Sequence, residues 1–459
     1  MIDRRDFLKT AGKGVGIAGA GLVLPTGGPA SGGNRSPSSE RQEGGAPFVR
    51  SGQMPDVVVV GAGNFGTWTA YHLRRLGARV TLVDQYGPGN SRSASGGETR
   101  GVRTSYGDRP HGIDWSKWAA RAIERWQEWD EEHFAKGMLP RLFFTTGDII
   151  MRDEMTPFME QSIENWREMD WPYEVLSADE IRYRWSVIRT PDVDVGLYEP
   201  RAGVVRARRA MESVAQVFQM EGGELVIGKA RPPEAAGRRI DHVLVGDGER
   251  VAGGAFVFAL GPWFPKYFPE LMGRRLRTST VGHTYYFATP PGDEGYRHPN
   301  CPSYNVPGVT GWPALGSDSR GFRIRTGGAS FDDPDTSIRW IPEDRHDRPR
   351  GVLAKYFPAL AELPINETRA CHYCGTVSRN FIIDRHPGFD NGWLAGGGSA
   401  ESFKQGPVLG EYVARRVLDQ RASDDPDVAL DEGFRLAEEE FPEDEGNWSD
   451  GEGEGWVDR

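Results

Sequence analysis

The stretch VVVVGAGNFG, residues 57–66, decides the fold of this 459-residue chain. Its four consecutive valines predict a strand that is buried on both faces. Gly61, Gly63 and Gly66 follow directly with GxGxxG spacing. In that spacing the first glycine permits a tight turn, the second lets the backbone approach a pyrophosphate, and the third allows a helix to pack closely on the strand. The stretch therefore predicts a phosphate-binding turn at a helix N-terminus.

The residues that follow complete a βαβ unit. TWTAYHLRRLG, residues 67–77, has apolar residues at roughly helical spacing and ends on Gly77, which is typical of a helix C-terminus. RVTLVD, residues 79–84, predicts a second strand, and Asp84 lies where an acid accepts a hydrogen bond from a ribose hydroxyl. The helix, the second strand and the acid together argue against a glycine-rich turn that binds nothing. The unit predicts a bound dinucleotide but does not distinguish FAD from NAD.

Charge is concentrated near the ends of the chain. The formal net charge is −11, and most of the excess acid lies after Glu438 in a glycine-rich stretch, while residues 1–50 carry more basic than acidic side chains. We predict that residues 426–459 form a disordered acidic tail. No basic stripe marks the body of the chain, so we expect no nucleic-acid partner.

The three cysteines, Cys301, Cys371 and Cys374, are too few for a disulfide framework. The last two form a CxxC pattern, which fits a redox pair, half of a zinc site, or a function of one cysteine alone. No second CxxC and no correctly spaced histidines accompany it. We therefore predict no metal site.

The first 53 residues predict an export signal followed by a linker. Arg4 and Arg5 precede Phe-Leu-Lys and a short apolar run at residues 15–24, which resembles a twin-arginine signal; a chance arginine pair before a flexible tail is the alternative. The apolar run is too short for a stable membrane span. We expect a periplasmic or extracellular protein that the twin-arginine machinery exports in folded form, with its cofactor already inserted.

The spacing of apolar residues predicts the helices and strands in the rest of the chain. A helix is predicted over residues 113–134, and its tryptophans, which lie mostly on one face, are interpreted as core. A strand is expected at 141–151, and Ser177 with Glu180 predicts a capped helix start. The strand at 255–261 ends on Gly261, where the backbone could approach a cofactor. Further strands are expected at 277–290, 320–327, 380–384 and 392–398, and a helix at 406–419.

These pieces, in this order, resemble the FAD-dependent amine oxidases of the D-amino-acid-oxidase superfamily, on the branch of the sarcosine, N-methyltryptophan, pipecolate and fructosyl-amine oxidases. The resemblance covers about residues 55–420. Besides the βαβ unit it rests on SASGGETRGVR (93–103), GLYEPRAGVVRARR (196–209), FVFALGPW (256–263), RACHYCGTVSRNFIIDRHP (369–387) and GWLAGGGSAESFKQGP (392–407).

The resemblance implies an α/β fold in which a Rossmann-like FAD-binding domain is interleaved with a substrate domain built on a mostly antiparallel sheet. The FAD-binding domain is expected to comprise residues 54–139, 198–265 and 371–425. The substrate domain is expected to comprise residues 140–197 and 266–370. The signal with its linker and the acidic tail lie outside both domains.

The resemblance also implies roles for individual residues. FAD is expected to contact Gly61, Gly63, Phe65, Gly66, Asp84, Ser95, Thr99, Arg100, Gly261, Cys371, Gly397 and Lys404. Cys371 matches a cysteine that bonds covalently to the flavin, with an ordinary core cysteine as the alternative; a disulfide to Cys374 would compete. Arg103 and Lys404 are expected to hold a substrate carboxylate. Tyr304 is expected to line the substrate pocket, and Arg323, Arg100 and Tyr373 are assigned catalytic roles.

Two departures from the family pattern bear on the chemistry. Arg323 stands where the family has a lysine that activates oxygen; it keeps the positive charge but positions water differently. The segment 399–404 reads SAESFK where the family has Ser-Gly-His-Gly-Phe-Lys, so two glycines are lost and Glu401 is introduced. The added carboxylate would disfavour an anionic reduced flavin.

The predicted function is an exported FAD-dependent oxidoreductase, expected to act as a monomer, that converts the C–N bond of a secondary amino acid or N-substituted amine to an imine, with oxygen reduced to hydrogen peroxide. An amine dehydrogenase that passes electrons to a quinone or carrier is the first alternative, because Arg323 replaces the oxygen-activating lysine. A catalytically silent flavin-binding protein is the second, because of the altered segment 399–404.

Overall fold

The valine stretch forms strand β1 (Asp56–Val60) near the centre of a six-stranded sheet in the computed structural model, which describes residues 56–234, 237–316, 320–327, 333–421, 425–436 and 439–442. The strand order is β18-β19-β12-β1-β2-β9, and every pair is parallel except β18 with β19. The other strands are β2 (Arg79–Asp84), β9 (Glu224–Ile227), β12 (Ala255–Phe258), β18 (Ile382–Arg385) and β19 (Gly392–Gly396).

Both faces of this sheet are covered, which explains why β1 is apolar at successive positions. Val57 and Val59 face a core shared with α2 (Asn64–Arg75), α3 (Gly112–Trp129) and α10 (Gly406–Val417). Val58 and Val60 face a second core that includes the hairpin of β10 (His242–Val245) and β11 (Glu249–Ala252). The sequence prediction of a strand buried on both faces is confirmed.

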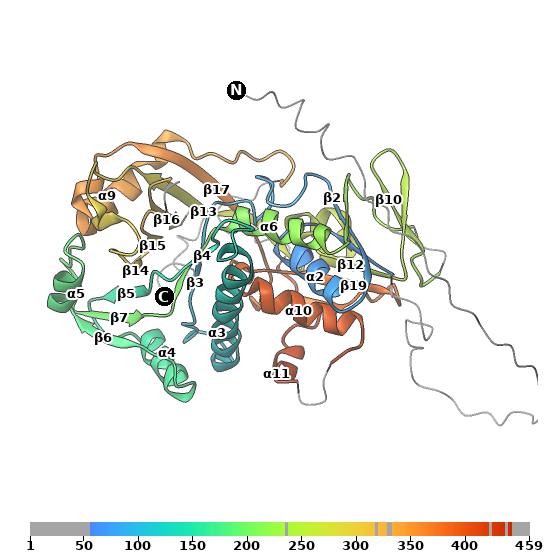
Figure 1. Ribbon diagram of the computed structural model, residues 1–459, viewed down its shortest axis with the longest axis horizontal. Coiled ribbons are helices and arrows are strands. Elements are labelled where there is room, and N and C mark those ends of the chain that lie inside the picture. Colours follow the sequence, from blue (N-terminus) through green and yellow to red (C-terminus); the bar gives the residue numbers. More distant parts are fainter. Residues whose placement is uncertain are drawn as a thin grey trace, which may run out of the picture. The chain divides into compact units, whose positions relative to one another are not determined.

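Helices from the two ends of the described chain meet on one face of the sheet. Figure 1 shows α2, in blue, beside α10, in red. Their approach depends on Gly410, because a Cβ at that position would lie 2.5 Å from the backbone carbon of Trp68. The C-terminal helix therefore closes directly over the helix of the glycine motif.

The second sheet has eight strands in the order β17-β13-β16-β15-β14-β5-β7-β6. Neighbouring strands are antiparallel, except that β14 is parallel to β5. The chain enters this sheet twice, once before and once after β9 and β12. Its strands are β5 (Asp148–Arg152), β6 (Glu174–Ser177), β7 (Val195–Glu199), β13 (Arg277–Phe287), β14 (Ser303–Val306), β15 (Val309–Trp312), β16 (Phe322–Gly327) and β17 (Ile365–Gly375). The α/β fold with a mostly antiparallel second sheet is as predicted.

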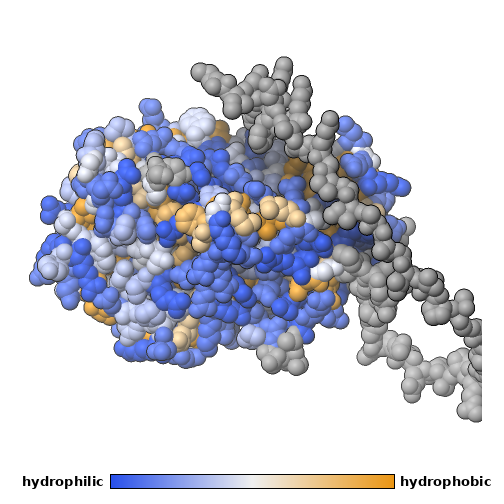
Figure 2. Space-filling model, in the orientation of Figure 1, coloured by the Kyte–Doolittle hydropathy of each residue, from blue (hydrophilic) through white to orange (hydrophobic). Residues whose placement is uncertain are grey.

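A small three-stranded sheet and several helices complete the described chain. The small sheet has the order β3-β8-β4. Its strands are β3 (Arg100–Val102), β8 (Gly203–Val205) and β4 (Phe143–Phe144); the remaining helices are α4 (Pro157–Glu168), α5 (Ala178–Arg184), α6 (Ala207–Met220), α7 (Phe264–Tyr267), α8 (Pro269–Met272), α9 (Asp347–Tyr356) and α11 (Val428–Asp431). In the described ranges no helix is both long and apolar enough to traverse a membrane. The surface seen in Figure 2 is mainly hydrophilic, with small scattered apolar groups.

Several predicted elements differ from the observed ones in their bounds. The strand expected at 141–151 is two strands, β4 and β5, because Gly147 between them has φ +68°. The helix expected at 113–134 is α3 followed by a π-helical turn, Asp130–Phe134. The domain boundary placed at residue 371 falls inside β17, so Cys371 lies on a strand of the eight-stranded sheet. The predicted signal, linker and most of the acidic tail lie outside the described residues. The beginning of the tail was predicted to be disordered but is folded: it contains α11, and Leu430 and Phe434 pack into the core because they are apolar.

Candidate active site

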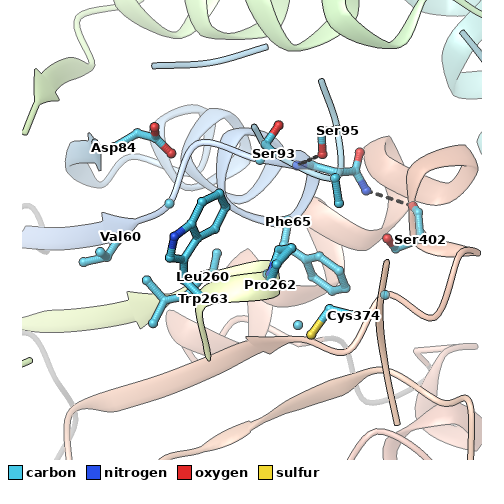
Figure 3. A pocket seen from close by; sticks show the side chains of 18 of the residues that line it. Val60, Phe65, Asp84, Ser93, Ser95, Leu260, Pro262, Trp263, Cys374 and Ser402 are labelled. Atoms are coloured by element: carbon cyan, nitrogen blue, oxygen red, sulfur yellow. Dashed lines mark hydrogen bonds between the residues drawn. The ribbon is translucent and has the colours of Figure 1, made fainter. Parts of the chain in front are cut away.

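A long cleft with about 1160 Å³ of empty space runs past the carboxyl ends of β1, β2 and β12. Residues from the glycine motif, the loop after β2, the turn after β12 and the loop after β19 line it. Figure 3 shows Asp84 on one side of this cleft, Cys374 and Ser402 on the other, and the Trp263 ring between them. Ligands of open parallel sheets bind at this edge.

A different feature of the surrounding structure explains why each of the three motif positions is a glycine. Gly61 has φ +107°, and a Cβ there would lie 2.3 Å from the carbonyl oxygen of Ala259, just after β12. A Cβ on Gly66 would lie 1.8 Å from the Gly61 oxygen. Gly63, in contrast, would meet only the Ser95 hydroxyl, at 3.5 Å. The space where a Gly63 side chain would lie is therefore open toward the cleft, which lets a phosphate group come close to the backbone.

Asp84 holds the turn together as well as lining the cleft. Its Oδ2 accepts from the backbone N–H of Ala62 at 2.8 Å, and its Oδ1 accepts from those of Tyr86 and Gly87, also at 2.8 Å. Burial raises the pKa of this carboxyl, and the three backbone donors oppose that rise. Asp84 thus fixes the glycine turn and remains placed at the cleft for a ribose hydroxyl.

Asn64, which the sequence interpretation missed, joins three segments at the helix N-terminus. Its backbone N–H donates to Ser95 Oγ at 2.9 Å, and its side-chain amide donates to the Ser402 oxygen at 2.8 Å. Its position inside the glycine motif was the available signal. Phe65 beside it lines the cleft and packs edge-on against Phe381, with ring centroids 5.6 Å apart.

The far side of the cleft is built from backbone in unusual conformations. Gly261 (φ +50°) and Gly397 (φ +66°), two of the expected FAD contacts, both line it. Ser399 (φ +45°) and Ala400 (φ +63°) hold left-handed conformations that favour glycine. Ala400 therefore stands in a backbone conformation that alanine tolerates poorly and that glycine adopts without strain.

Arg100 connects the cleft to the eight-stranded sheet. Its guanidinium donates to the carbonyl oxygens of Thr99 and Ala94 at 2.8 and 2.7 Å, and Nη2 lies 3.8 Å from Cys371 Sγ. Tyr373, two residues along β17, also lines the cleft, and its hydroxyl accepts from Arg325 Nη1 at 2.8 Å. Arg325 was not predicted, since nothing in the sequence distinguishes it from other strand arginines.

Arg323 is buried behind this group. Its guanidinium carbon lies 3.6 Å from the ring centroid of Trp312, and its Nε and Nη1 have no hydrogen-bond partner among the described residues. Burial lowers its pKa to about 10, so the side chain stays charged at neutral pH. The indole of Trp312 donates to Thr99 Oγ1 at 3.0 Å. Thr99 itself lines a neighbouring smaller cavity and not the long cleft.

Tyr304 does not line the long cleft. It is buried, its ring stacks on Phe322 with centroids 5.4 Å apart, and its hydroxyl donates to the Arg323 carbonyl oxygen at 3.1 Å. In this structure it supports the strand that carries Arg323. The sequence interpretation expected Tyr304 to line the substrate pocket; in the structure, alternation along β14 turns its ring into the apolar core.

The two predicted carboxylate-holding cations already face a resident carboxylate. Lys404 Nζ lies 2.5 Å from Glu401 Oε2, and Tyr106 donates to the same oxygen at 3.2 Å. Burial favours the neutral form of Glu401, but Lys404, Arg109 and Arg103 outweigh it and hold the pKa of this carboxyl well below its usual value. Arg103 keeps a buried Nε that has no hydrogen-bond partner in the described chain.

The three cysteines are free thiols, so the structure holds no disulfide between Cys371 and Cys374. Cys374 lines the cleft within an apolar cluster, and burial raises its pKa to about 12. Cys371 is buried on the strand next to the Arg100 guanidinium. Among the described residues no group of three or more His, Cys, Asp or Glu is arranged to hold a metal ion.

The residues present fit a dinucleotide of FAD's kind. The open side of Gly63 and the N-terminus of α2 suit a pyrophosphate, and Asp84 suits a ribose. Gly261, Gly397 and Arg100 also line this cleft, and the Arg100 guanidinium would place a positive charge beside a bound ring system. Of the twelve predicted FAD contacts, Thr99, Cys371, Lys404 and Gly66 are not lining residues of the cleft.

Comparison with known proteins agrees with a site for FAD. A family model described as FAD dependent oxidoreductase matches residues 56–416. The chain is 27% identical over 387 residues to a monomeric sarcosine oxidase of Arthrobacter sp. strain TE1826, covering 81% of this chain and 94% of that protein. It is also 27% identical over 372 residues to an N-methyl-L-tryptophan oxidase of Citrobacter koseri, covering 78% and 93%.

Solved structures share the fold. The fructosyl amine:oxygen oxidoreductase Amadoriase I of Aspergillus fumigatus superposes with a TM-score of 0.69 at 22% sequence identity, covering 85% of this chain and 91% of that one. At this identity the likeness concerns the fold alone. It agrees with the two interleaved sheets described above.

Proposed function

Because this chain belongs to the FAD dependent oxidoreductase (DAO) family, we propose that it oxidises the C–N bond of a secondary amino acid or N-substituted amine to an imine. The observation that carries the proposal is the cation Arg100 on the lining of a cleft that fits FAD, with Lys404 directly after the lining residue Phe403 and Arg103 three residues after Arg100. The names of the relatives, sarcosine oxidase and N-methyl-L-tryptophan oxidase, supply the class of N-substituted substrate.

FAD, when bound, takes up the electrons that leave the substrate carbon. The residues of this chain position the reactants. Arg100, fixed by two backbone carbonyls, keeps a positive charge at the inner end of the cleft, and Tyr373, fixed by Arg325, presents its ring there. Arg103 and Lys404 orient the polar end of the substrate, which brings the carbon next to nitrogen into a defined position.

Anaerobic reduction of the bound flavin tests this function. Sarcosine, L-proline, L-pipecolate, N-methyl-L-tryptophan and the amide of each are mixed with purified protein without oxygen. At least one compound should bleach the visible flavin absorption. Protein that purifies without a yellow chromophore contradicts the cofactor assignment. Bound flavin that none of the compounds bleaches supports the alternative of a catalytically silent flavin-binding protein.

We propose oxygen as the electron acceptor, with hydrogen peroxide as its product. A dehydrogenase that passes electrons to a quinone or carrier is the second candidate, and the stacking of Arg323 on Trp312 favours it, because this geometry limits how the cation can position oxygen or water. Stopped-flow mixing of reduced enzyme with oxygen separates the two. Reoxidation faster than that of free reduced flavin supports the oxidase; slow reoxidation that Arg323→Lys accelerates at least tenfold supports the dehydrogenase.

We propose that FAD is attached covalently through Cys371. The Cys371 thiol lies 3.8 Å from the guanidinium of Arg100, a residue that borders the cleft, whereas burial raises the pKa of the Cys374 thiol and makes it a poor nucleophile. Cys371→Ser should therefore release the flavin on denaturation, and Cys374→Ser should retain it on the polypeptide. Flavin fluorescence of the denatured band in a gel measures this, and flavin retained by Cys371→Ser contradicts the attachment site.

We propose export by the twin-arginine route, on the strength of the sequence at Arg4 and Arg5. Replacing both with lysine should leave the flavoprotein inside the cell, as judged by fractionation. A variant that reaches the periplasm or medium in the same amount as the natural chain contradicts the proposal.

A further inference from the structure

Charged side chains of both signs meet next to the loop after β19, which lines the cleft. Arg103, Arg109 and Lys404 are the cations; Glu401 and Asp148 are the anions. Arg103 is attracted to both carboxylates, and Asp148 is attracted to Arg103 and Lys404. A lysine that awaits a carboxylate substrate should have no carboxylate partner within the protein, because the substrate supplies the counter-charge, whereas Lys404 is already paired with Glu401.

The contact between Lys404 and Glu401 is close and enclosed. Nζ and Oε2 are 2.5 Å apart, and the two side chains are 6% and 18% exposed. Tyr106 donates its hydroxyl to the same Oε2 at 3.2 Å, and Gln405 in turn donates to the Tyr106 oxygen at 2.9 Å. Because these groups fix one another, Glu401 is a built part of the site and not a mobile surface acid.

Two polar atoms of the cluster have no hydrogen-bond partner in the described part of the chain. Glu401 Oε1 accepts no hydrogen bond from the described part of the chain, and Arg103 Nε has no acceptor there. Ala400 and Ser402, on either side of Glu401, both line the long cleft. The free acceptor on Glu401 suits an N–H group, and the free donor on Arg103 suits an oxygen.

A substrate carboxylate fits this cluster poorly. To reach Lys404 it would have to displace Glu401 from an enclosed ion pair, which leaves a second carboxylate without its partner. A neutral oxygen, such as that of an amide or alcohol, satisfies Arg103 Nε without adding a charge. An amine N–H satisfies Glu401 Oε1 in the same way.

We propose that Glu401 determines substrate choice, and that the substrate is an N-substituted amine carrying a neutral oxygen group in place of the α-carboxylate. Glu401 occupies the position of the substrate's own charge and receives the amine N–H through Oε1. This inference rests on the proposed amine oxidation and names the substrate class of that site.

Binding of two inert ligands of the same shape tests the selectivity without turnover. Pivalamide and pivalate are titrated into the flavoprotein, and the perturbation of the flavin absorption gives each Kd. The natural protein should bind pivalamide at least tenfold more tightly than pivalate. Glu401→Gln should reverse the order, because pivalate then supplies the missing counter-charge to Lys404, and Glu401→Asp should keep the natural order. Equal affinities in the natural protein, or tighter binding of pivalate, overturn the proposal.

Matched substrates give the second measurement. Sarcosine is compared with sarcosinamide, and L-proline with L-prolinamide, by anaerobic flavin reduction. Each amide should reduce the flavin with at least tenfold higher efficiency than its acid, and Glu401→Gln should narrow or invert the ratio. A preference for the acids overturns the proposal. Failure of all four compounds contradicts the amine oxidation itself, while the pivalamide and pivalate titration still decides the role of Glu401.

Discussion

Gly61 and Gly63 look equivalent in the sequence, but the molecule uses them differently. Gly61 has a positive φ and its Cα faces a carbonyl oxygen of the neighbouring chain segment, so it is required for folding. Gly63 has an ordinary φ of −80° and faces open space on the cleft side, so we assign it to ligand binding. The same motif therefore contains one structural and one binding glycine.

Substituting each with alanine separates these roles. Gly61→Ala should destabilise the protein by about 2 kcal/mol or more, because the Cβ clashes with Ala259 and the backbone is strained. Gly63→Ala should keep the thermal stability of the FAD-free protein within about 0.5 kcal/mol but weaken FAD binding roughly tenfold. Thermal unfolding and flavin titration measure the two effects. Full FAD affinity in Gly63→Ala contradicts the assignment.

At the scale of elements, contacts between distant segments are set by single positions. The end of β7 is one case. Glu199 accepts from the Thr104 backbone N–H at 3.0 Å, from the Thr104 hydroxyl at 2.7 Å and from the Trp171 indole at 2.9 Å. It thereby joins the segment after β3, which carries Arg103, to the eight-stranded sheet.

Glu199 should make stability depend on pH. Burial raises its pKa to about 7, against the opposing effect of the Thr104 and Trp171 hydrogen bonds. The folded state therefore holds a proton that the unfolded state has lost, and stability falls as pH rises from about 4.5 to 7, by up to roughly 3 kcal/mol. Glu199→Gln should reduce this fall, measured as denaturant midpoints at pH 5 and 8. The control variant Glu154→Gln, at an exposed position, should show the same fall in stability as the natural protein. If the fall is also unchanged in Glu199→Gln, Glu199 is not its cause.

The contact between α2 and α10 depends on Gly410. Gly410→Ala should cost about 1–3 kcal/mol, because its Cβ would overlap the Trp68 backbone. Gly351 is the matched control, since it lies in α9 and a Cβ added there would have nothing within 4 Å. Gly351→Ala should raise the free energy of unfolding by about 0.5–1 kcal/mol, because alanine lowers the conformational entropy of the unfolded chain. Denaturant unfolding measures both, and a neutral Gly410→Ala shows that the helices can separate.

At the scale of the whole molecule, the two sheets cannot fold as independent pieces of chain. The six-stranded sheet takes strands from before, between and after the two segments that build the eight-stranded sheet. Bound FAD adds a further link, because the cleft is lined by residues from all three parts of the six-stranded sheet and by Tyr373 of β17. Both features favour a single cooperative unfolding transition.

Removal of FAD should therefore lower the stability of the whole molecule. Cys371→Ala is used so that the flavin can be dialysed away whether or not it is normally attached. The flavin-free protein should melt several degrees lower in one transition, and added FAD at a hundredfold its Kd should restore about 2.7 kcal/mol. Two separate calorimetric transitions, or a melting temperature that FAD leaves unchanged, contradict this.

The fold and the dinucleotide-binding part of the site were predictable, because they depend on residues that lie close together in the sequence. The glycine motif, its strand and helix, and Asp84 are close in sequence, so their geometry follows from backbone conformation and periodicity. The capped helix at Ser177 was predictable for the same reason, since its capping box is complete within four residues. Positions such as Arg325 and Trp312 carry no local signal, because their partners come from other strands.

Hydrophobic periodicity and glycine placement act over short distances, so the chain alone determines the dinucleotide turn and the order of helices and strands, while the interleaving of two domains was implied by the family resemblance. The three-dimensional packing decides which groups neutralise one another. Glu401 and Lys404 are three residues apart, but Tyr106, Arg103 and Asp148 reach them from remote segments. Whether the cations there face a substrate or a resident carboxylate is a matter of charge balance in space, which spacing along the chain does not encode.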